Sequence, residues 1–177
     1  MVTRLSAEKH PEAAIRAVRL LHRLRTPAEL TIVGDGPVRP ALEQEVADLP
    51  VRFAGHVVHR REIARLLGEA DVAIAPSPHE TFGLAALEAL ACGTPVVAAA
   101  DGAVGELVSA GAGVIAARGV NGLAAGIAEV LSGGRDAQRV AARRRAEEFP
   151  WSRTIESMIR LHKAVARSPM RALRVAS

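Results

Sequence analysis

The sequence contains few aromatic residues and a single cysteine. Tyrosine is absent, and aromatic residues make up 2% of the 177 positions. This leaves no stacking platform of the kind that binds single-stranded nucleic acid. Cys92 has no partner for a disulfide within the chain, and no cysteine and histidine cluster has zinc spacing. His56 and His59 form only a weak metal pair, which we interpret as surface or loop residues.

Long apolar runs and two common catalytic motifs are also missing. No stretch approaches the ~18 residues of a membrane span, and the first ten residues lack the apolar segment of a signal peptide. We therefore expect a soluble, cytoplasmic protein. The absence of a G-x-x-x-x-G-K-[ST] loop argues against a P-loop nucleotidase. The absence of G-x-S-x-G argues against a serine nucleophile elbow.

Basic residues are concentrated near the end of the sequence. The formal net charge is +4, but residues 1–134 carry 12 basic and 15 acidic side chains, whereas residues 135–177 carry 11 and 4. The slightly acidic body argues against a nucleic-acid-binding core. We interpret the arginine run at 143–145 as a solvated helix face. Attraction to anionic lipid is the alternative, which would place the protein peripherally at the inner face of the plasma membrane.

Short β-rich runs alternate with amphipathic helical patterns along the chain. The runs lie at residues 30–33, 51–54, 71–75, 95–98 and 114–116. Helices are expected to begin near Pro11, Val38, Arg60, Gly83, Ala103, Asn121, Arg135 and Trp151. Because the runs show little polar alternation, we expect strands buried on both faces. The pattern predicts an α/β fold with a Rossmann-like, doubly wound parallel sheet and two extra C-terminal helices.

Three glycine-containing loops follow predicted strands. They span residues 34–37, 76–83 and 100–105. Glycine lets backbone amides approach a ligand closely, and a following helix N-terminus attracts phosphate. Each loop could equally be ordinary turn chemistry. Because ligands bind at the carboxyl ends of parallel strands, the three together indicate one binding rim.

Two carboxylates, Glu80 and Glu88, lie eight residues apart across the start of a predicted helix. If the whole stretch were helical, a rise of about 1.5 Å per residue would place their Cα atoms roughly 12 Å apart. The carboxylate pairs of glycoside hydrolases lie about 5 to 9.5 Å apart. The spacing is therefore too long for a shared dyad and suits an extended ligand with two ends.

Five motifs occur in a recognisable order. They read RLSAEK at residues 4–9, GDGP at 34–37, ETFGL at 80–84 followed by Glu88, GTPVV at 93–97 and GELV at 105–108. Together they resemble the donor-binding half of family 4 glycosyltransferases, which are retaining enzymes of the two-domain GT-B fold. The resemblance runs from about Thr3 to about Lys163. The wording of residues 79–97 is most similar to bacterial mannosyltransferases of the phosphatidylinositol mannoside type.

The resemblance implies roles for four charged residues. Glu80 would lie beside the donor sugar, and Glu88 would bind the ribose of the nucleotide. Arg4 and Lys9 would hold the diphosphate, so that preorganised cations stabilise the leaving group. We thus regard Glu80, Arg4 and Lys9 as catalytic candidates and expect no metal or other cofactor. The alternatives are a solvated helix residue for Glu88, a dipole-favoured N-terminal acid for Glu80, and a capping turn with solvated ends for Lys9.

The remaining donor-binding candidates are backbone or apolar contacts. The amides of Phe82, Gly83 and Leu84, at the start of a predicted helix, would support phosphate and sugar. Gly34 belongs to the first glycine loop, and Val57 would lie near the base by resemblance.

The predicted organisation has three parts. Residues 1–150 would form a Rossmann-like domain that binds the nucleotide sugar, with a truncated first strand. Residues 151–167 would form the C-terminal crossover helix, and 168–177 a basic, disordered tail. The acceptor-binding domain of the family is absent and would be supplied elsewhere. Ile155, Met158 and Ile159 would then be either exposed or buried against the present domain.

These inferences lead to two functional hypotheses. The first is the donor-binding domain of a retaining glycosyltransferase that moves a hexose, mannose from GDP-mannose, to a hydroxyl acceptor. The second is a non-catalytic module that binds nucleotide sugars or interacts with another protein. Turnover of the donor distinguishes the first from the second.

Overall fold

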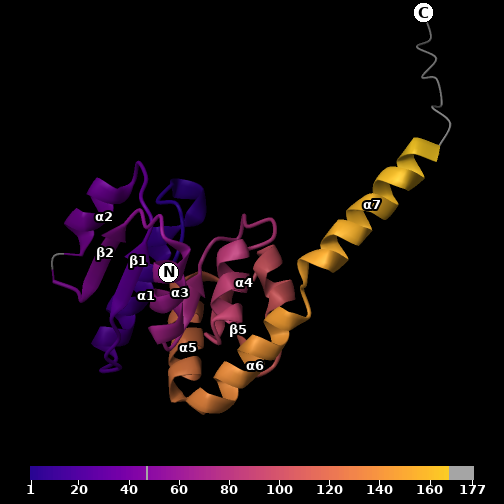
Figure 1. Ribbon diagram of the computed structural model, residues 1–177. Coiled ribbons are helices and arrows are strands. Elements are labelled where there is room, and N and C mark those ends of the chain that lie inside the picture. Colours follow the sequence, from indigo (N-terminus) through magenta and orange to yellow (C-terminus); the bar gives the residue numbers. More distant parts are fainter. Residues whose placement is uncertain (47, 168–177) are drawn as a thin grey trace, which may run out of the picture. The chain divides into compact units, whose positions relative to one another are not determined.

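The computed structural model describes residues 1–46 and 48–167 (Figure 1). The described strands are β1 (Leu30–Val33), β2 (Val51–Gly55), β3 (Ala73–Ala75), β4 (Val96–Ala99) and β5 (Gly113–Ala116). The helices are α1 (Pro11–Arg23), α2 (Arg39–Glu45), α3 (Arg60–Glu69), α4 (Leu84–Ala91), α5 (Gly119–Ser132), α6 (Arg135–Glu147) and α7 (Trp151–Arg167). Strands and helices alternate from β1 to α5, so the predicted α/β class is confirmed.

The strands form two parallel sheets, one with the order β1-β2 and the other with the order β3-β4-β5. The segment before Arg4 lies beside β1 and forms a single parallel bridge, between Val2 and Val33. The amide of Thr3 donates to the carbonyl oxygen of Val33 (2.9 Å), and the amide of Val33 donates to that of Met1 (2.8 Å). This short segment thus extends the β1 side of the sheet by one bridge.

Burial of the strands depends on their position in the sheet. The central strand β4 has three buried residues in succession, as expected for a strand covered by helices on both faces. At the edges, β2 exposes Arg52, and Ile115 of β5 is 50% exposed. The expectation of strands buried on both faces is therefore correct for β4 and wrong for these edge strands, which have a neighbour on one side only.

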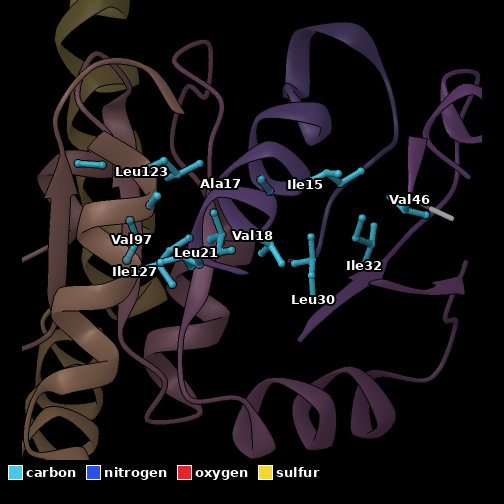
Figure 2. Close-up of a cluster of buried hydrophobic side chains, with 14 of the residues drawn as sticks. Ile15, Ala17, Val18, Leu21, Leu30, Ile32, Val46, Val97, Leu123 and Ile127 are labelled. Carbon is cyan, nitrogen blue, oxygen red and sulfur yellow. The ribbon is translucent and has the colours of Figure 1, made fainter. Parts of the chain in front are cut away.

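Helices α1 and α5 pack against each other and close the core over both sheets (Figure 2). The buried face of α1 has helical spacing, and α5 contributes a matching face. The cluster includes Ile15, Val18 and Leu21 of α1, Leu123 and Ile127 of α5, Leu30 and Ile32 of β1, and Val97 of β4. Each such side chain contributes about 1.5–3 kcal/mol when fully buried. The core therefore holds the two sheets together from one side.

The helix predicted near Ala103 is instead a 3₁₀ turn, η2 (Ala103–Leu107). Glycine precedes it at 102 and interrupts it at 105, and the amide of Gly105 donates to the carbonyl oxygen of Gly102 (3.1 Å). Glycine costs about 1 kcal/mol in a helix interior relative to alanine, so five residues of this composition do not sustain an α-helix. Val104 and Leu107 nevertheless point inward and are buried.

The arginines of α6 contact backbone carbonyls at the ends of other elements. Arg139 donates to the carbonyl oxygen of Gly68 (2.7 Å), and Arg143 donates to that of Ala91 (2.7 Å). Arg145 donates to the carbonyl oxygen of Leu107 (3.0 Å). Cations suit these positions because helix C-termini carry partial negative charge. Arg143 is exposed, as predicted for a solvated arginine face, and also bonds to a carbonyl, whereas Arg145 is half-buried and departs from that prediction.

Residues from Glu147 onward form a second compact unit, which is described as far as Arg167. Its helix α7 is amphipathic. Trp151, Ile155, Met158 and Ile159 on its apolar face are 68%, 53%, 55% and 47% exposed. The predicted basic tail at 168–177 lies outside the described residues. No helix in residues 1–46 and 48–167 is long and apolar enough to cross a membrane.

Candidate donor site

The predicted site residues lie on loops that follow the carboxyl ends of parallel strands. Arg4 and Lys9 follow the short segment beside β1, and Gly34 comes directly after β1. Val57 follows β2, and Glu80 lies between β3 and α4. The carboxyl ends of parallel strands lie on the same side of a sheet. We call the loops that follow these ends, with Arg4, Lys9, Gly34, Val57 and Glu80, the rim.

Lys9 and Glu80 meet at this rim, although they are 71 positions apart in the sequence. The Nζ atom of Lys9 lies 2.7 Å from Oε2 of Glu80, and the two side chains are 25% and 28% exposed. Lys9 ends a 3₁₀ turn, η1 (Ala7–Lys9), and Glu80 lies in an irregular loop. The alternative in which Lys9 has a solvated end is therefore wrong, since its ammonium is held by a carboxylate.

The turn that carries Lys9 is fixed locally. The hydroxyl of Ser6 donates to Oε1 of Glu8 (2.6 Å), and the amide of Lys9 donates to the carbonyl oxygen of Ser6 (3.0 Å). The hydrogen bond from Ser6 lowers the pKa of the Glu8 carboxyl, with smaller contributions from Arg4 and Lys9. Glu8 therefore stays ionised beside the two cations predicted to bind the diphosphate.

A small cavity of about 40 Å³ adjoins the ion pair. Its lining includes Lys9, Ser77, Glu80, Gly83 and Val104. Pockets that enclose drug-sized ligands measure about 300–1,000 Å³. The cavity is therefore too small to enclose a ligand of that size.

Helix α4 begins where the resemblance places the phosphate and sugar contacts. Gly83 is its N-cap residue with φ +86°, and a Cβ atom there would lie 2.6 Å from Cγ2 of Val104. Only glycine meets both conditions without strain. Phe82 and Leu84 on either side are 43% and 51% exposed. The first amides of a helix have no intrahelical acceptor, so this exposed end offers donors to a ligand.

Glu88 lies on the exposed side of α4, one turn after Leu84. Within residues 1–46 and 48–167 its carboxylate forms no ion pair. Glu80 precedes α4 and is not helical, so the separation of roughly 12 Å expected for a continuous helix does not apply to this pair. The two acids thus differ in setting: Glu80 is held by Lys9, whereas Glu88 is solvated.

The other predicted contact residues differ in their exposure and packing. Arg4 is exposed at the rim, and Val57 is half-buried. Gly34 has φ +130°, and a Cβ atom there would lie 1.8 Å from the carbonyl oxygen of Thr3. Its amide donates to the carbonyl oxygen of Gly55 (2.7 Å). In this structure Gly34 permits close packing of two backbones, and its own amide is already engaged.

Two further groups at the rim were not singled out by the sequence analysis. Ser77 is buried and links two loops through its hydroxyl. Asp35 accepts hydrogen bonds from the amide of Gly36 (2.7 Å) and from Arg39 (3.0 Å), which lower the pKa of its carboxyl. The serine is flanked by Pro76 and Pro78 directly after β3, a position that could have drawn attention to it.

Metal ligands are not gathered at this rim. In the part of the chain that the structure describes, no group of three or more histidine, cysteine, aspartate or glutamate side chains is arranged to hold a metal ion.

The sequence and the fold resemble known glycosyltransferases. The family described as "Glycosyl transferases group 1" matches residues 1–148. A GDP-mannose-dependent alpha-(1-6)-phosphatidylinositol dimannoside mannosyltransferase of Mycobacterium tuberculosis strain H37Ra is 44% identical over 163 residues, which cover 92% of this chain and 43% of that protein. A glycogen synthase of M. tuberculosis strain CDC 1551 is 39% identical over 175 residues, with 94% and 42% covered.

A solved structure with the same fold is the pneumococcal O-GlcNAc transferase GtfA in complex with UDP and GlcNAc. It aligns with a TM-score of 0.78 at 20% identity and covers 94% of this chain and 35% of that one. At this identity the likeness shows the fold alone, which is that of a GT-B glycosyltransferase. The chain spans less than half the length of the curated relatives described above. The match over residues 1–148 and the fold together show that the chain belongs to the group 1 glycosyl transferases.

Proposed function

We propose that this chain is the donor-binding domain of a retaining glycosyltransferase. It would transfer mannose from GDP-mannose to a hydroxyl acceptor held by an acceptor-binding domain outside these residues. The observation that carries the proposal is the Lys9–Glu80 pair, 2.7 Å apart, beside the exposed start of α4. The choice of GDP-mannose rests on the relative that is 44% identical and is named as dependent on it.

The proposed roles follow from the charge that develops during transfer. Cleavage of the bond between sugar and nucleotide leaves a diphosphate with additional negative charge. Lys9 and the exposed Arg4 would stabilise that charge, as preorganised cations do in the transition state. The first amides of α4, at Phe82, Gly83 and Leu84, would add dipolar support. With two side-chain cations in this role, the proposal includes no metal.

The two glutamates would act on different parts of the donor. Glu80, released from Lys9 when a phosphate takes its place, would contact the sugar. Glu88, exposed on α4, would accept hydrogen bonds from the ribose hydroxyls. The loops with Gly34 and Val57, on the β1–β2 side of the rim, would lie toward the base. In this proposal Glu80 and Glu88 serve the two ends of one ligand.

A peripheral membrane location is part of the proposal. The mannosyltransferase that is 44% identical is named for a phosphatidylinositol dimannoside, which is a lipid. Helix α7 has an apolar face and carries Arg153, Arg160 and Lys163 on its polar side. Such a helix attracts anionic membranes. We therefore propose a cytoplasmic protein that contacts the inner face of the plasma membrane.

Calorimetric titration with GDP, UDP, ADP and GDP-mannose tests this function. We expect saturable binding of GDP and GDP-mannose, and weaker binding by Glu88→Ala. The loss should be about 1.5–3 kcal/mol, the value of a charge-assisted hydrogen bond. Glu129→Ala, which removes an exposed glutamate near the far end of α5, is the matched control and should bind as the unaltered chain does.

The outcomes separate the hypotheses. Equal affinity in Glu88→Ala and the unaltered chain would remove Glu88 from the ribose site. Binding together with slow release of mannose from GDP-mannose would indicate a transferase domain. Binding without any turnover, also after addition of an acceptor domain, would favour the non-catalytic module. No binding across the nucleotide panel would contradict the proposed donor site.

A further inference from the structure

Ser77 is one of three buried polar residues in the described part of the chain, and both hydrogen-bonding functions of its hydroxyl are used. It is 5% exposed. The hydroxyl donates to the carbonyl oxygen of Glu8 (2.7 Å) and accepts from the amide of His79 (3.1 Å). It therefore joins the turn that carries Lys9 to the loop that carries Glu80.

The two hydrogen bonds of Ser77 lie directly beside the two charged residues of the site, Lys9 and Glu80. The carbonyl of Glu8 belongs to the peptide unit that leads into Lys9, and the amide of His79 belongs to the residue before Glu80. Lys9 lies at the end of a three-residue 3₁₀ turn, and such short turns have weak internal hydrogen bonding. A lysine side chain has four rotatable bonds, so the depth that its ammonium reaches depends on where its backbone is held.

The loop that bears Ser77 is itself supported by the rest of the rim. The amide of Ala103 donates to the carbonyl oxygen of Glu80 (3.3 Å). A Cβ atom on Gly102 would lie 2.9 Å from the carbonyl oxygen of Ser77, so the two loops are in close backbone contact. The β3–α4 loop therefore has contacts of its own to the rim, and the hydroxyl of Ser77 connects this loop to the Lys9 turn.

We propose that Ser77 is a positioning residue of the donor site, whose hydroxyl sets the place of the Lys9 ammonium relative to Glu80 and to a bound diphosphate. This inference rests on the proposed function for its ligand. Ser77 acts through Lys9 and is not assigned a contact with the donor. It is therefore expected to affect recognition of phosphate and to leave recognition of the nucleoside unchanged.

Thr94 provides a matched control within the same chain. It is fully buried, and its hydroxyl donates to the carbonyl oxygen of Leu67 (2.6 Å) at the end of α3. It precedes β4, at the opposite edge of the sheet from the rim. Ser77→Ala and Thr94→Val each remove one buried hydroxyl that bonds to a backbone carbonyl, but only the first bond lies at the site.

The experiment measures binding of GDP and of guanosine by calorimetry. The single variants are Ser77→Ala, Ser77→Thr, Thr94→Val and Lys9→Ala. A double variant combines Lys9→Ala with Ser77→Ala. Ser77→Ala should weaken GDP binding about tenfold, the lower end for a charge-assisted hydrogen bond, and leave guanosine binding unchanged. Ser77→Thr keeps the hydroxyl and should restore GDP binding, whereas Thr94→Val should leave the ratio of the two affinities unchanged.

The Lys9→Ala background tests whether Ser77 acts through Lys9. There, Ser77→Ala should cause no further loss of GDP affinity. A further loss in that background, or a parallel loss of GDP and guanosine binding in Ser77→Ala alone, would overturn the inference. An unchanged GDP affinity in Ser77→Ala would overturn it as well.

A measurement without ligand keeps the inference separate from the proposed function. The NMR signal of the Lys9 ammonium is observable when a carboxylate protects it from exchange with water. It should be present in the unaltered chain and in Thr94→Val, and broadened in Ser77→Ala. If no nucleotide binds, the proposed function fails, and this signal still decides the role of Ser77: its persistence in Ser77→Ala would refute it.

Discussion

Replacement of Glu80 by glutamine should strengthen the binding of free GDP. In the ligand-free chain the ammonium of Lys9 is paired with Glu80 at 2.7 Å. A diphosphate must therefore displace the carboxylate before it gains the cation. Glutamine keeps the size of the side chain but removes the charge, so Lys9 is released and one source of repulsion for phosphate disappears.

The magnitude follows from the exposure of the pair. Ion pairs at protein surfaces contribute up to about 1 kcal/mol, and this pair is about three-quarters buried, which places it near the upper end. A release of ~1 kcal/mol corresponds to GDP binding that is about fivefold tighter. GDP-mannose should gain less than GDP, because in the proposed site Glu80 also contacts the sugar.

Calorimetry at low and high salt is the assay, because electrostatic contributions between exposed charges are screened as ionic strength rises. Glu129→Gln gives the same change in net charge far from the rim and controls for the field of the whole domain. In the Lys9→Ala background, Glu80→Gln should improve GDP binding by less than it does in the unaltered chain, because only the relief of repulsion remains. Weaker or unchanged GDP binding in Glu80→Gln would refute the view that Glu80 holds back Lys9.

Three further predictions concern stability and reactivity. Gly34→Ala should lower the free energy of unfolding in urea by more than the ~1–3 kcal/mol of backbone strain, since its Cβ atom would also meet the carbonyl of Thr3; a smaller loss would contradict the close packing. Arg139→Met should cost about 1–2 kcal/mol in the same assay by removing its bonds to helix-end carbonyls, and an unchanged midpoint would contradict that role. Burial raises the pKa of the Cys92 thiol, so at pH 8 iodoacetamide should modify this thiol more slowly in the folded chain than in urea. The rate in the folded chain should increase as the pH rises. Equal rates in the folded chain and in urea would contradict this prediction.

The strands were predictable because each is identified by the residues within its own short run. Residues such as Val96 and Val97 of β4 are β-branched, buried and bounded by turn residues, so the run identifies a strand before its neighbours are known. The segment at Ala103 shows the limit of the same reasoning. Its apolar spacing resembles a helix, but the glycines at 102 and 105 reduce it to a 3₁₀ turn.

The contacts of the site were less predictable because they join distant parts of the chain. Lys9 and Glu80 were each identified, but their pairing depends on two loops that the fold brings together. The hydroxyl of Ser77 acts on the backbone, and no charge or motif spacing reveals that in the sequence. The same holds for Arg143 and Arg145, whose acceptors are carbonyls at the ends of elements far away in the sequence.

The two parallel sheets carry different parts of the rim. The bridge of Val2 is made to Val33 on the β1 side, and packing of α1 against α5 joins the two sheets on one side. The loops predicted to face the base, with Gly34 and Val57, follow strands of one sheet, whereas Glu80 and Glu88 follow a strand of the other. The span of the rim, and with it the length of ligand that the domain is predicted to accept, is therefore set by how α1 and α5 hold the two sheets together.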